Sequence, residues 1–337
     1  MKLQDNRKFF FCEIKLKIFL TILFLKKIKS ALFEFMRTEK MYFNDLYFLE
    51  QVFVPPLRDS DIIPIERRQS FLKDAVFNLS NLVANHKRGL MRCFERQNIE
   101  HPLIESIADM VLVACINWQD DYAAYIAHWP IQEATLKNEL IYNKKFAQHC
   151  EKCSRHPKAQ RQSIIALLQR PVFRLPRYPL ILNRMLDNTP ENHSDRENLP
   201  IASRAISDIA KSTQPGIEQS KNKVLFWEMA SALDFRTGEL HDIDLLDDMR
   251  TLLHDGLLYK RERSPTDLHG WHGKRIFVLD NYLLITEPNQ KKSSDQIRYR
   301  LTSRPLPLEL LVVSNDNPSP THRTACLLSN ERRSDGL

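Results

Sequence analysis

Between residues 29 and 233 the chain contains long stretches without glycine or clusters of turn-forming residues, and this feature restricts its possible folds more than any other. Apolar side chains in these stretches recur with helical spacing, and short polar segments separate them. Long helices with short connections pack most readily as antiparallel neighbours. The sequence therefore predicts a mainly α protein built around an elongated antiparallel helical bundle over residues 29–233.

Prolines and polar residues predict where the individual helices begin and end. We expect helices over residues 32–53, 67–96, 102–128, 135–153, 159–186 and 195–213, and a last one that ends near residue 233. Pro55-Pro56 and Trp129-Pro130 should each end a helix, because proline in a helix interior removes a backbone hydrogen bond. Asp195 is a suitable N-cap, and Gln214-Pro215-Gly216 should interrupt the chain before the last helix.

The pattern changes after Asp234. Short runs typical of β-strands cover residues 256–263, 274–280 and 282–288, and clusters of turn-forming residues divide them. Residues 297–301 and 307–313 are two further candidates. We expect a linker over 234–250 and a partial antiparallel β domain over 251–337 that ends in a disordered tail.

The net charge of +7 is concentrated near the N-terminus. Residues 1–30 hold eight lysines and arginines against Asp5 and Glu13, a net of +6, which leaves +1 for the rest of the chain. A nucleic-acid-binding protein gathers its basic groups on its working surface. The nearly neutral body therefore argues against nucleic acid as a partner.

Residues 1–28 form a basic and apolar extension. Its longest uncharged segment, Ile18–Leu25, has eight residues, whereas a membrane-spanning helix needs about 20. A signal peptide would need a longer apolar core and a small-residue cleavage site. We expect this extension to be disordered or an artefact of the assigned start, with contact to an anionic membrane surface as the alternative.

The six cysteines are too few for a disulfide framework in a chain of 337 residues, so a reduced, cytoplasmic compartment is the simpler interpretation. His149, Cys150, Cys153 and His156 lie close enough together to suggest zinc ligands. Zinc sites usually take ligands from two separated segments, and no second pair follows. We expect these four to be helix-surface residues, and we expect no metal or other cofactor.

The first predicted helix carries one carboxylate on an otherwise apolar seam. The seam residues follow one another at spacings of three and four, and they are Leu32, Phe35, Glu39, Tyr42, Leu46, Leu49 and Phe53. This spacing is typical of the buried side of a packed helix. A lone buried carboxylate is costly, so Glu39 either has an internal partner or faces another molecule.

A second segment, residues 167–186, combines arginines with prolines. Four guanidinium groups share one side of the predicted helix, those of Arg170, Arg174, Arg177 and Arg184. Three prolines in the same segment would bend or break an ordinary helix. The arginine stripe is either a solvated face or a surface that binds a partner.

These two segments together resemble the Dbl homology (RhoGEF) domain. RTEKMYFNDLYFLEQVFVPPL at residues 37–57 is similar to the opening helix of that family, and PVFRLPRYPLILNRMLDNTP at 171–190 is similar to its signature helix. Residues 71–97 and 121–126 also fit, and RPLPLELL at 304–311 resembles the PH-domain region of fungal Rho exchange factors. The resemblance covers about residues 29–313.

The resemblance implies an exchange factor that binds the two switch regions of a Rho-type small GTPase and promotes GDP release. By position, Glu39 would contact switch I, and Arg177 would replace the basic residue that contacts the switch II side. Arg174 occupies the usual arginine position, and Arg184 continues the same stripe. Gln214 is the residue nearest to the asparagine that the last helix normally offers.

Three positions depart from the family pattern: Phe173 stands where glutamine is usual, and Pro215-Gly216 disrupts the last helix. An exchange factor needs no covalent chemistry, because binding of GTPase and release of nucleotide are reciprocally coupled. The sequence has no GxxxxGK[ST], GxSxG or HExxH motif, so we do not expect an enzyme in the covalent sense. A non-exchanging GTPase-binding scaffold and a membrane adaptor remain as alternatives.

The resemblance also implies a PH-like domain after the bundle. Phosphoinositide-binding members of that family gather basic residues on their first two strands, and the candidates in this chain are Lys260, Arg261, Arg263, Lys274 and Arg275. They make a phosphoinositide or an anionic membrane surface a possible second partner, with weak or no specific binding. They also suggest recruitment from the cytoplasm to the plasma-membrane cortex.

Overall fold

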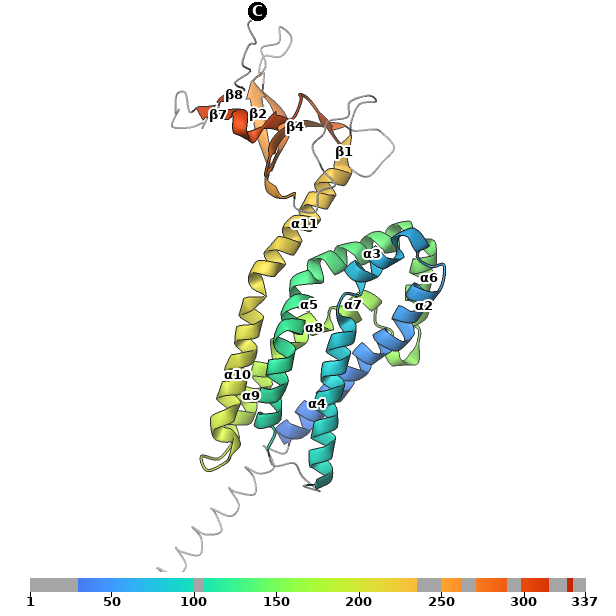
Figure 1. Ribbon diagram of the computed structural model, residues 1–337, viewed down its shortest axis with the longest axis vertical. Helices are drawn as coiled ribbons and strands as arrows, with labels where there is room; N and C mark the ends of the chain where they lie inside the picture. Colours follow the sequence, from blue (N-terminus) through green and yellow to red (C-terminus); the bar gives the residue numbers. More distant parts are fainter. Residues whose placement is uncertain are drawn as a thin grey trace, which may run out of the picture. The chain divides into compact units, whose positions relative to one another are not determined.

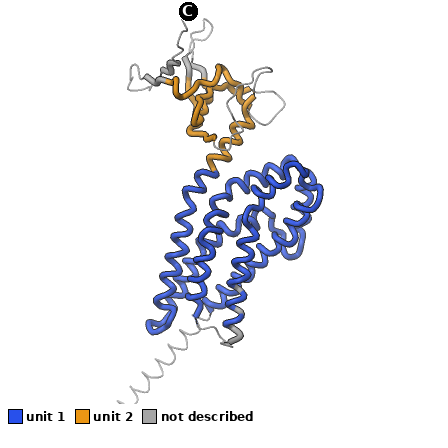
Figure 2. Tube along the Cα trace, in the orientation of Figure 1, with its two compact units in different colours: residues 1–220 blue, residues 221–337 orange. Residues whose placement is uncertain are grey.

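The computed structural model describes residues 30–99, 106–234, 250–261, 271–289, 298–314 and 326–329. The chain divides into two compact units, residues 1–220 and 221–337, and the division falls within helix α11 (Gln214–Ala232) (Figure 2). The first unit is helical and the second is mostly β-sheet, so the predicted fold class is confirmed. The predicted N-terminal extension (1–28) and nearly all of the predicted linker (234–250) lie outside the described residues.

The helical unit begins with a helix over residues 30–48, which continues without a break through a π-helical turn, η1 (Leu49–Phe53), into α2 (Val54–Asp59). The prediction that Pro55-Pro56 ends this helix is wrong. Both prolines lie in the first turn of α2, where a missing backbone N–H removes no α-helical bond. The π-helical turn precedes them directly and carries the chain onward.

The middle of the unit contains α3 (Ile65–Ala75), α4 (Leu79–Ile99), α5 (Ala108–Tyr142) and α6 (Lys144–Ser154). The predicted helix over 67–96 is broken at Phe77, which has a φ of 53°. The predicted end at Trp129-Pro130 is wrong, because α5 continues past Pro130 to Tyr142. Buried residues on both sides of the proline hold α5 together, and Figure 1 shows that α5 bends, as proline-containing helices do.

The arginine-rich segment forms three short helices, α7 (Ile164–Leu168), α8 (Arg170–Arg174) and α9 (Arg177–Asp187), after a 3-10 turn, η2 (Pro157–Ala159). Prolines occupy the first turns of α8 and α9, where they are tolerated. The predicted single helix over 159–186 is therefore bent twice, as its prolines suggest.

Helix α10 (Asp195–Ser212) packs against both α9 and α5. Asp195 does not cap its own helix as predicted. Its carboxylate instead accepts hydrogen bonds from the backbone amides of Ile107, at 3.1 Å, and Ala108, at 3.4 Å, and so caps the start of α5. Gln214-Pro215-Gly216 opens α11 rather than interrupting the chain, since only Thr213 separates α10 from α11.

One continuous apolar core fills the helical unit, and the buried seam of the first helix contributes Leu32, Phe35, Tyr42, Leu46, Leu49 and Phe53 to it. The largest fully buried side chains include Tyr122, Tyr125 and Tyr178. Three tyrosine hydroxyl groups inside an apolar core need hydrogen-bond partners. The hydroxyl of Tyr125 donates to the backbone oxygen of Leu168 at 2.7 Å, and those of Tyr122 and Tyr178 belong to the network described in the next subsection.

The second unit contains β1 (Leu233–Asp234), β2 (Leu252–Arg261), β3 (Trp271–Leu279), β4 (Tyr282–Asn289), β5 (Arg298–Leu301) and β6 (Leu306–Pro307) in one sheet. Its order is β1-β5-β4-β3-β2, with β6 beside β4. Phe226 and Met229 of α11 pack on Phe277 and Leu284 of this sheet. A 3-10 turn, η3 (Leu308–Leu310), leads to β7 (Leu311–Ser314), which pairs with β8 (Cys326–Ser329). The predicted antiparallel strands are confirmed, apart from the parallel pairing of β1 with β5.

Candidate functional site

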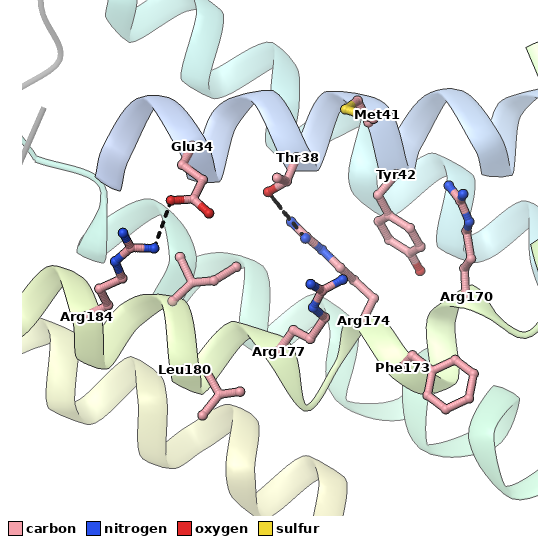
Figure 3. Close-up of a pocket in the computed structure, with 11 residues that line it drawn as sticks. Glu34, Thr38, Met41, Tyr42, Arg170, Phe173, Arg174, Arg177, Leu180 and Arg184 are labelled. Carbon is pink, nitrogen blue, oxygen red and sulfur yellow. Dashed lines mark hydrogen bonds and ion pairs between the residues drawn. The ribbon is translucent and has the colours of Figure 1, made fainter. Parts of the chain in front are cut away.

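A hollow of about 540 Å³ lies between the first helix and helices α8 and α9 (Figure 3). All four arginines of the predicted stripe line it. The other lining residues are Glu34, Thr38, Met41, Tyr42, Phe173, Leu180 and Ile181. The two segments that the sequence singled out, more than 100 residues apart, therefore form the two walls of one site.

Three of the four arginines pair with carboxylates of the first helix, in antiparallel order. Arg184 contacts Glu34 at 3.0 Å, Arg174 contacts Glu39 at 2.7 Å, and Arg170 pairs with Asp45. These pairs run from the exposed end of the hollow, at Glu34, to the buried carboxylates of Glu39 and Asp45. Three of the four arginines thus join the two walls of the hollow, although Arg184 stays largely exposed to solvent.

Glu39 lies at the centre of a buried network, with 6% of its surface exposed. Its Oε2 accepts hydrogen bonds from Nη2 of Arg174 and from the hydroxyl of Tyr178, each at 2.7 Å. Its Oε1 accepts from Nδ1 of His86. Burial would raise the pKa of Glu39, but the charge and hydrogen bond of His86, together with Arg174 and Tyr178, lower it to about 2.

The internal partner that the sequence left open for Glu39 is therefore present. These contacts correct the other alternative, in which Glu39 is an unpaired carboxylate that faces another molecule. The physical reason is the register between the first helix and α8, which places a buried guanidinium opposite the seam carboxylate. The predicted contact of Glu39 with switch I of a GTPase stays a prediction.

Arg174 is buried, with 7% of its surface exposed. Besides Glu39 it donates to Oγ1 of Thr38 at 3.3 Å from both terminal nitrogens, and its guanidinium lies 4.5 Å from the ring centroid of Tyr178. Neighbouring Tyr178 and Glu39 raise the pKa of Arg174 against the effect of burial. Arg174 is consequently a fixed part of the floor of the hollow.

Arg177 differs from the other three arginines. It is exposed, it begins α9, and no carboxylate among the described residues pairs with it. Three large apolar side chains line the same hollow and are exposed, namely Met41 at 47%, Phe173 at 60% and Leu180 at 69%. The hollow therefore offers an uncompensated positive charge surrounded by apolar surface.

Gln214 lies outside the residues that line the hollow. It is exposed at the start of α11, and its side chain donates to Glu218 at 3.1 Å. The neighbouring Gly216 has a packing role, because a Cβ at this position would lie 2.6 Å from Cβ of Ala127 on α5. The departure from the family pattern at Gly216 lets α11 approach α5 closely.

The candidate lipid-binding residues are only partly described. Lys274 is buried and pairs with Glu287, while Arg275 forms a two-pronged pair with Asp255, with Nε 2.6 Å from Oδ1. Two of the five basic groups are thus paired within the sheet. Lys260 and Arg261 lie on β2, but their side chains, like all of Arg263, fall outside the described residues.

Three of the four clustered histidines and cysteines are not on the helix surface as predicted, while His156 lies after the end of α6 and is partly exposed. His149, Cys150 and Cys153 are buried. The ring of His149 stacks on Phe53 and its Nε2 contacts the backbone oxygen of Phe53 at 2.9 Å. These side chains pack α6 against the π-helical turn.

Sequence reasoning missed the members of the network that lie outside the two matched segments. His86 on α4 and Tyr122 on α5 both belong to it. The available signal was a histidine on the face of α4 that also carries the buried Leu79, Leu82 and Val83.

Comparisons with known proteins give the family. The family model of the RhoGEF domain matches residues 31–214. The chain is 26% identical over 310 residues to Rho1 guanine nucleotide exchange factor 2 of Schizosaccharomyces pombe, and 26% identical over 301 residues to RHO1 GDP-GTP exchange protein 2 of Saccharomyces cerevisiae. These alignments cover 90% and 88% of this chain, but only 26% and 22% of the relatives. The chain therefore spans about a quarter of the length of such relatives.

Solved structures share the fold. The DH/PH domains of p115-RhoGEF superpose with a TM-score of 0.64 at 19% identity, covering 91% of this chain and 79% of that one. The PDZ-RhoGEF DH/PH domains, solved in complex with activated RhoA, give a TM-score of 0.61 at 19% identity, with 86% and 82% covered. None of the described helices is long and apolar enough to cross a membrane.

Proposed function

This chain belongs to the RhoGEF domain family, whose model matches more than half of its residues, and from this premise we propose that it is a guanine-nucleotide exchange factor for a Rho-type small GTPase. The helical unit, with predicted limits 29–233, would bind the switch regions of the GTPase and promote release of GDP. The similarity to exchange factors for Rho1 in two yeasts supports this substrate class. A cytoplasmic site of action, with recruitment to the membrane cortex through the PH-like part, belongs to the same proposal.

The observation that carries the proposal is the composition of the hollow. Arg177 has no carboxylate partner among the described residues, and Met41, Phe173 and Leu180 are exposed beside it. An exposed arginine that becomes buried among apolar side chains when a complex forms is typical of the residues that dominate protein–protein binding energy. The hollow is therefore suited to a protein surface with an acidic group among apolar side chains.

The proposed mechanism is thermodynamic coupling. Small GTPases with picomolar affinity hold their nucleotide by about 16 kcal/mol. A protein that binds the nucleotide-free GTPase more tightly than the loaded form must weaken nucleotide binding by the same factor. Exchange then needs no covalent step, only a surface rigid enough to favour one conformation of the switch regions. The paired walls of the hollow provide such a surface.

Release of a fluorescent GDP analogue from a panel of Rho-family GTPases, with the full chain added, tests the proposal. Acceleration of release on at least one GTPase is the expected result. Stable binding to a nucleotide-free GTPase without acceleration would identify a non-exchanging scaffold instead. Absence of both would overturn the proposal.

A further inference from the structure

His86 lies entirely inside the bundle, with 0% of its surface exposed, and contacts Oε1 of Glu39, while Arg174 and Tyr178 contact Oε2. Its ring packs between Tyr42, at a centroid distance of 4.9 Å, and Trp118, at 4.8 Å. It does not line the hollow. Both of its ring nitrogens have partners: Nδ1 contacts Glu39, and Nε2 lies 2.8 Å from the hydroxyl of Tyr122.

The direction of the hydrogen bond between His86 and Glu39 follows from the chemistry of the carboxylate. An ionised carboxylate can only accept hydrogen bonds, so Nδ1 of His86 carries a hydrogen and donates it in the hydrogen bond to Glu39. Nε2 of the same ring is within hydrogen-bond distance of the hydroxyl of Tyr122. The hydroxyl of Tyr122 in turn lies 2.9 Å from the hydroxyl of Tyr42. A continuous chain of hydrogen bonds thus connects Tyr42 and Tyr122 with His86 and Glu39.

The hydrogen bond from His86 determines how Arg174 can bind Glu39. Arginine and carboxylate groups frequently form two parallel hydrogen bonds. Here His86 occupies Oε1, and Arg174 reaches only Oε2, through Nη2. Both terminal nitrogens of Arg174 also donate to Thr38 on the wall of the hollow. Without the donor at Oε1, Arg174 could turn to grip both oxygens and would leave Thr38.

We propose that His86 is a positioning residue for nucleotide exchange, which fixes Glu39 so that Arg174 and Thr38 present one rigid floor to the GTPase. The inference rests on the function proposed above. His86 itself touches no partner and acts through Glu39 and then Arg174. If His86 only filled space, its loss would not change the orientation of Arg174.

Two amide variants separate the two ring nitrogens. The amide nitrogen of asparagine in His86→Asn reaches about as far as Nδ1 and can still donate to Glu39. The longer glutamine in His86→Gln reaches about as far as Nε2 and can replace only the contact with Tyr122. Tyr122→Phe removes that second contact and leaves the histidine in place.

The experiment measures GDP release and affinity for the nucleotide-free GTPase with the full chain, alongside the melting temperature of each variant. We expect His86→Asn and Tyr122→Phe to keep exchange within about threefold of wild type, and His86→Gln to lose about 10- to 100-fold, as misplacement of a site residue does. The melting temperatures of the two His86 variants should be similar. A loss of exchange that follows the melting temperature, or equal exchange in the two variants, would overturn the inference.

A double-mutant cycle between His86→Gln and Thr38→Val gives an independent measure. If His86 acts through Arg174 on Thr38, the two losses in affinity for the GTPase should not add. Additive losses would contradict the inference. Failure of the wild-type chain to release GDP or bind any GTPase would instead reject the proposed function, so the two failures are distinguishable.

Discussion

Nη2 of Arg174 lies 2.7 Å from Oε2 of Glu39, although 135 positions separate the two residues in the chain. Glu39 belongs to the first helix and Arg174 to the last turn of α8. The pair therefore joins the two segments whose sequences most resemble the family. Because both side chains are buried, removing either one leaves the other without its main charge partner.

Glu39→Ala should consequently destabilise the helical unit strongly. Removal of one partner of a buried ion pair costs about 3–5 kcal/mol, and here a guanidinium, an imidazole and a hydroxyl group all lose their acceptor. Urea unfolding measures the change. Glu34→Ala is the matched control, because the Glu34–Arg184 pair is largely exposed, and its loss should cost less than about 1 kcal/mol. Equal stabilities of the two variants would contradict the importance of burial.

The lowered pKa of Glu39 predicts a specific dependence of stability on acid. The value in the folded protein is about 2, below its ordinary value of 4.5, so Glu39 stabilises the fold above pH 4.5 and this contribution is lost as the pH falls toward 2. Between pH 5 and pH 3 the loss amounts to about 2 kcal/mol. The groups that face Glu39 are His86, Arg174 and Tyr178.

The measurement is the free energy of unfolding of wild type and of Glu39→Gln at both pH values. Glutamine does not titrate, so wild type should lose about 2 kcal/mol more than the variant on acidification. A parallel decline in the two proteins would show that Glu39 has an ordinary pKa. The comparison removes the contribution of the other carboxylates, which titrate in both.

These two predictions depend on contacts that the sequence alone suggested only in part. The seam spacing of the first helix indicated that Glu39 is buried, and the arginine spacing indicated that four guanidinium groups share a face. Both features are local, so periodicity reveals them. Which arginine meets which carboxylate depends on the register between two helices far apart in sequence, and no local pattern contains that register.

Helix ends show the same division between local and long-range information. The strands and most helices follow from periodicity, but Asp195 caps α5, a helix that begins 87 residues earlier. The helix through Pro55-Pro56 persists because a π-helical turn places both prolines in a new first turn. In each case a tertiary or geometric solution replaced the local rule. The role of His86 in the network could not be predicted for the same reason, because its hydrogen-bond partners come from the first helix and α5.

Reversal of charge at Arg177 tests the binding surface without disturbing the fold. Arg177 is exposed and pairs with no described carboxylate, so Arg177→Glu should change stability by less than about 0.5 kcal/mol. Exchange should fall by about 30-fold or more, because a central charged contact is worth about 2 kcal/mol or more in such interfaces. The assay is release of a fluorescent GDP analogue.

Lys158→Glu is the control for this charge reversal. Lys158 is also exposed and lies in the 3-10 turn η2, and it is not among the residues that line the hollow. The net charge changes equally in both variants, so a general effect of charge on encounter with the GTPase would appear in both. Equal exchange rates of Arg177→Glu and Lys158→Glu would reject the hollow as the binding surface.

Gly216 and Gly89 both lie in helices, yet alanine at the two positions should have opposite effects. A Cβ at Gly216 would lie 2.6 Å from Cβ of Ala127, whereas nothing lies within 4 Å of one at Gly89. Alanine favours a helix by about 1 kcal/mol over glycine, but overpacking costs about 1–3 kcal/mol. Gly89→Ala should therefore stabilise the unit and Gly216→Ala should destabilise it, as urea unfolding can show.

Combining Gly216→Ala with Ala127→Gly restores the space, so the double variant should be more stable than the sum of the two single changes predicts, by about 1 kcal/mol. Simple additivity would mean that α11 moves away from α5 without cost, and that the departure from the family pattern at Gly216 has no packing reason.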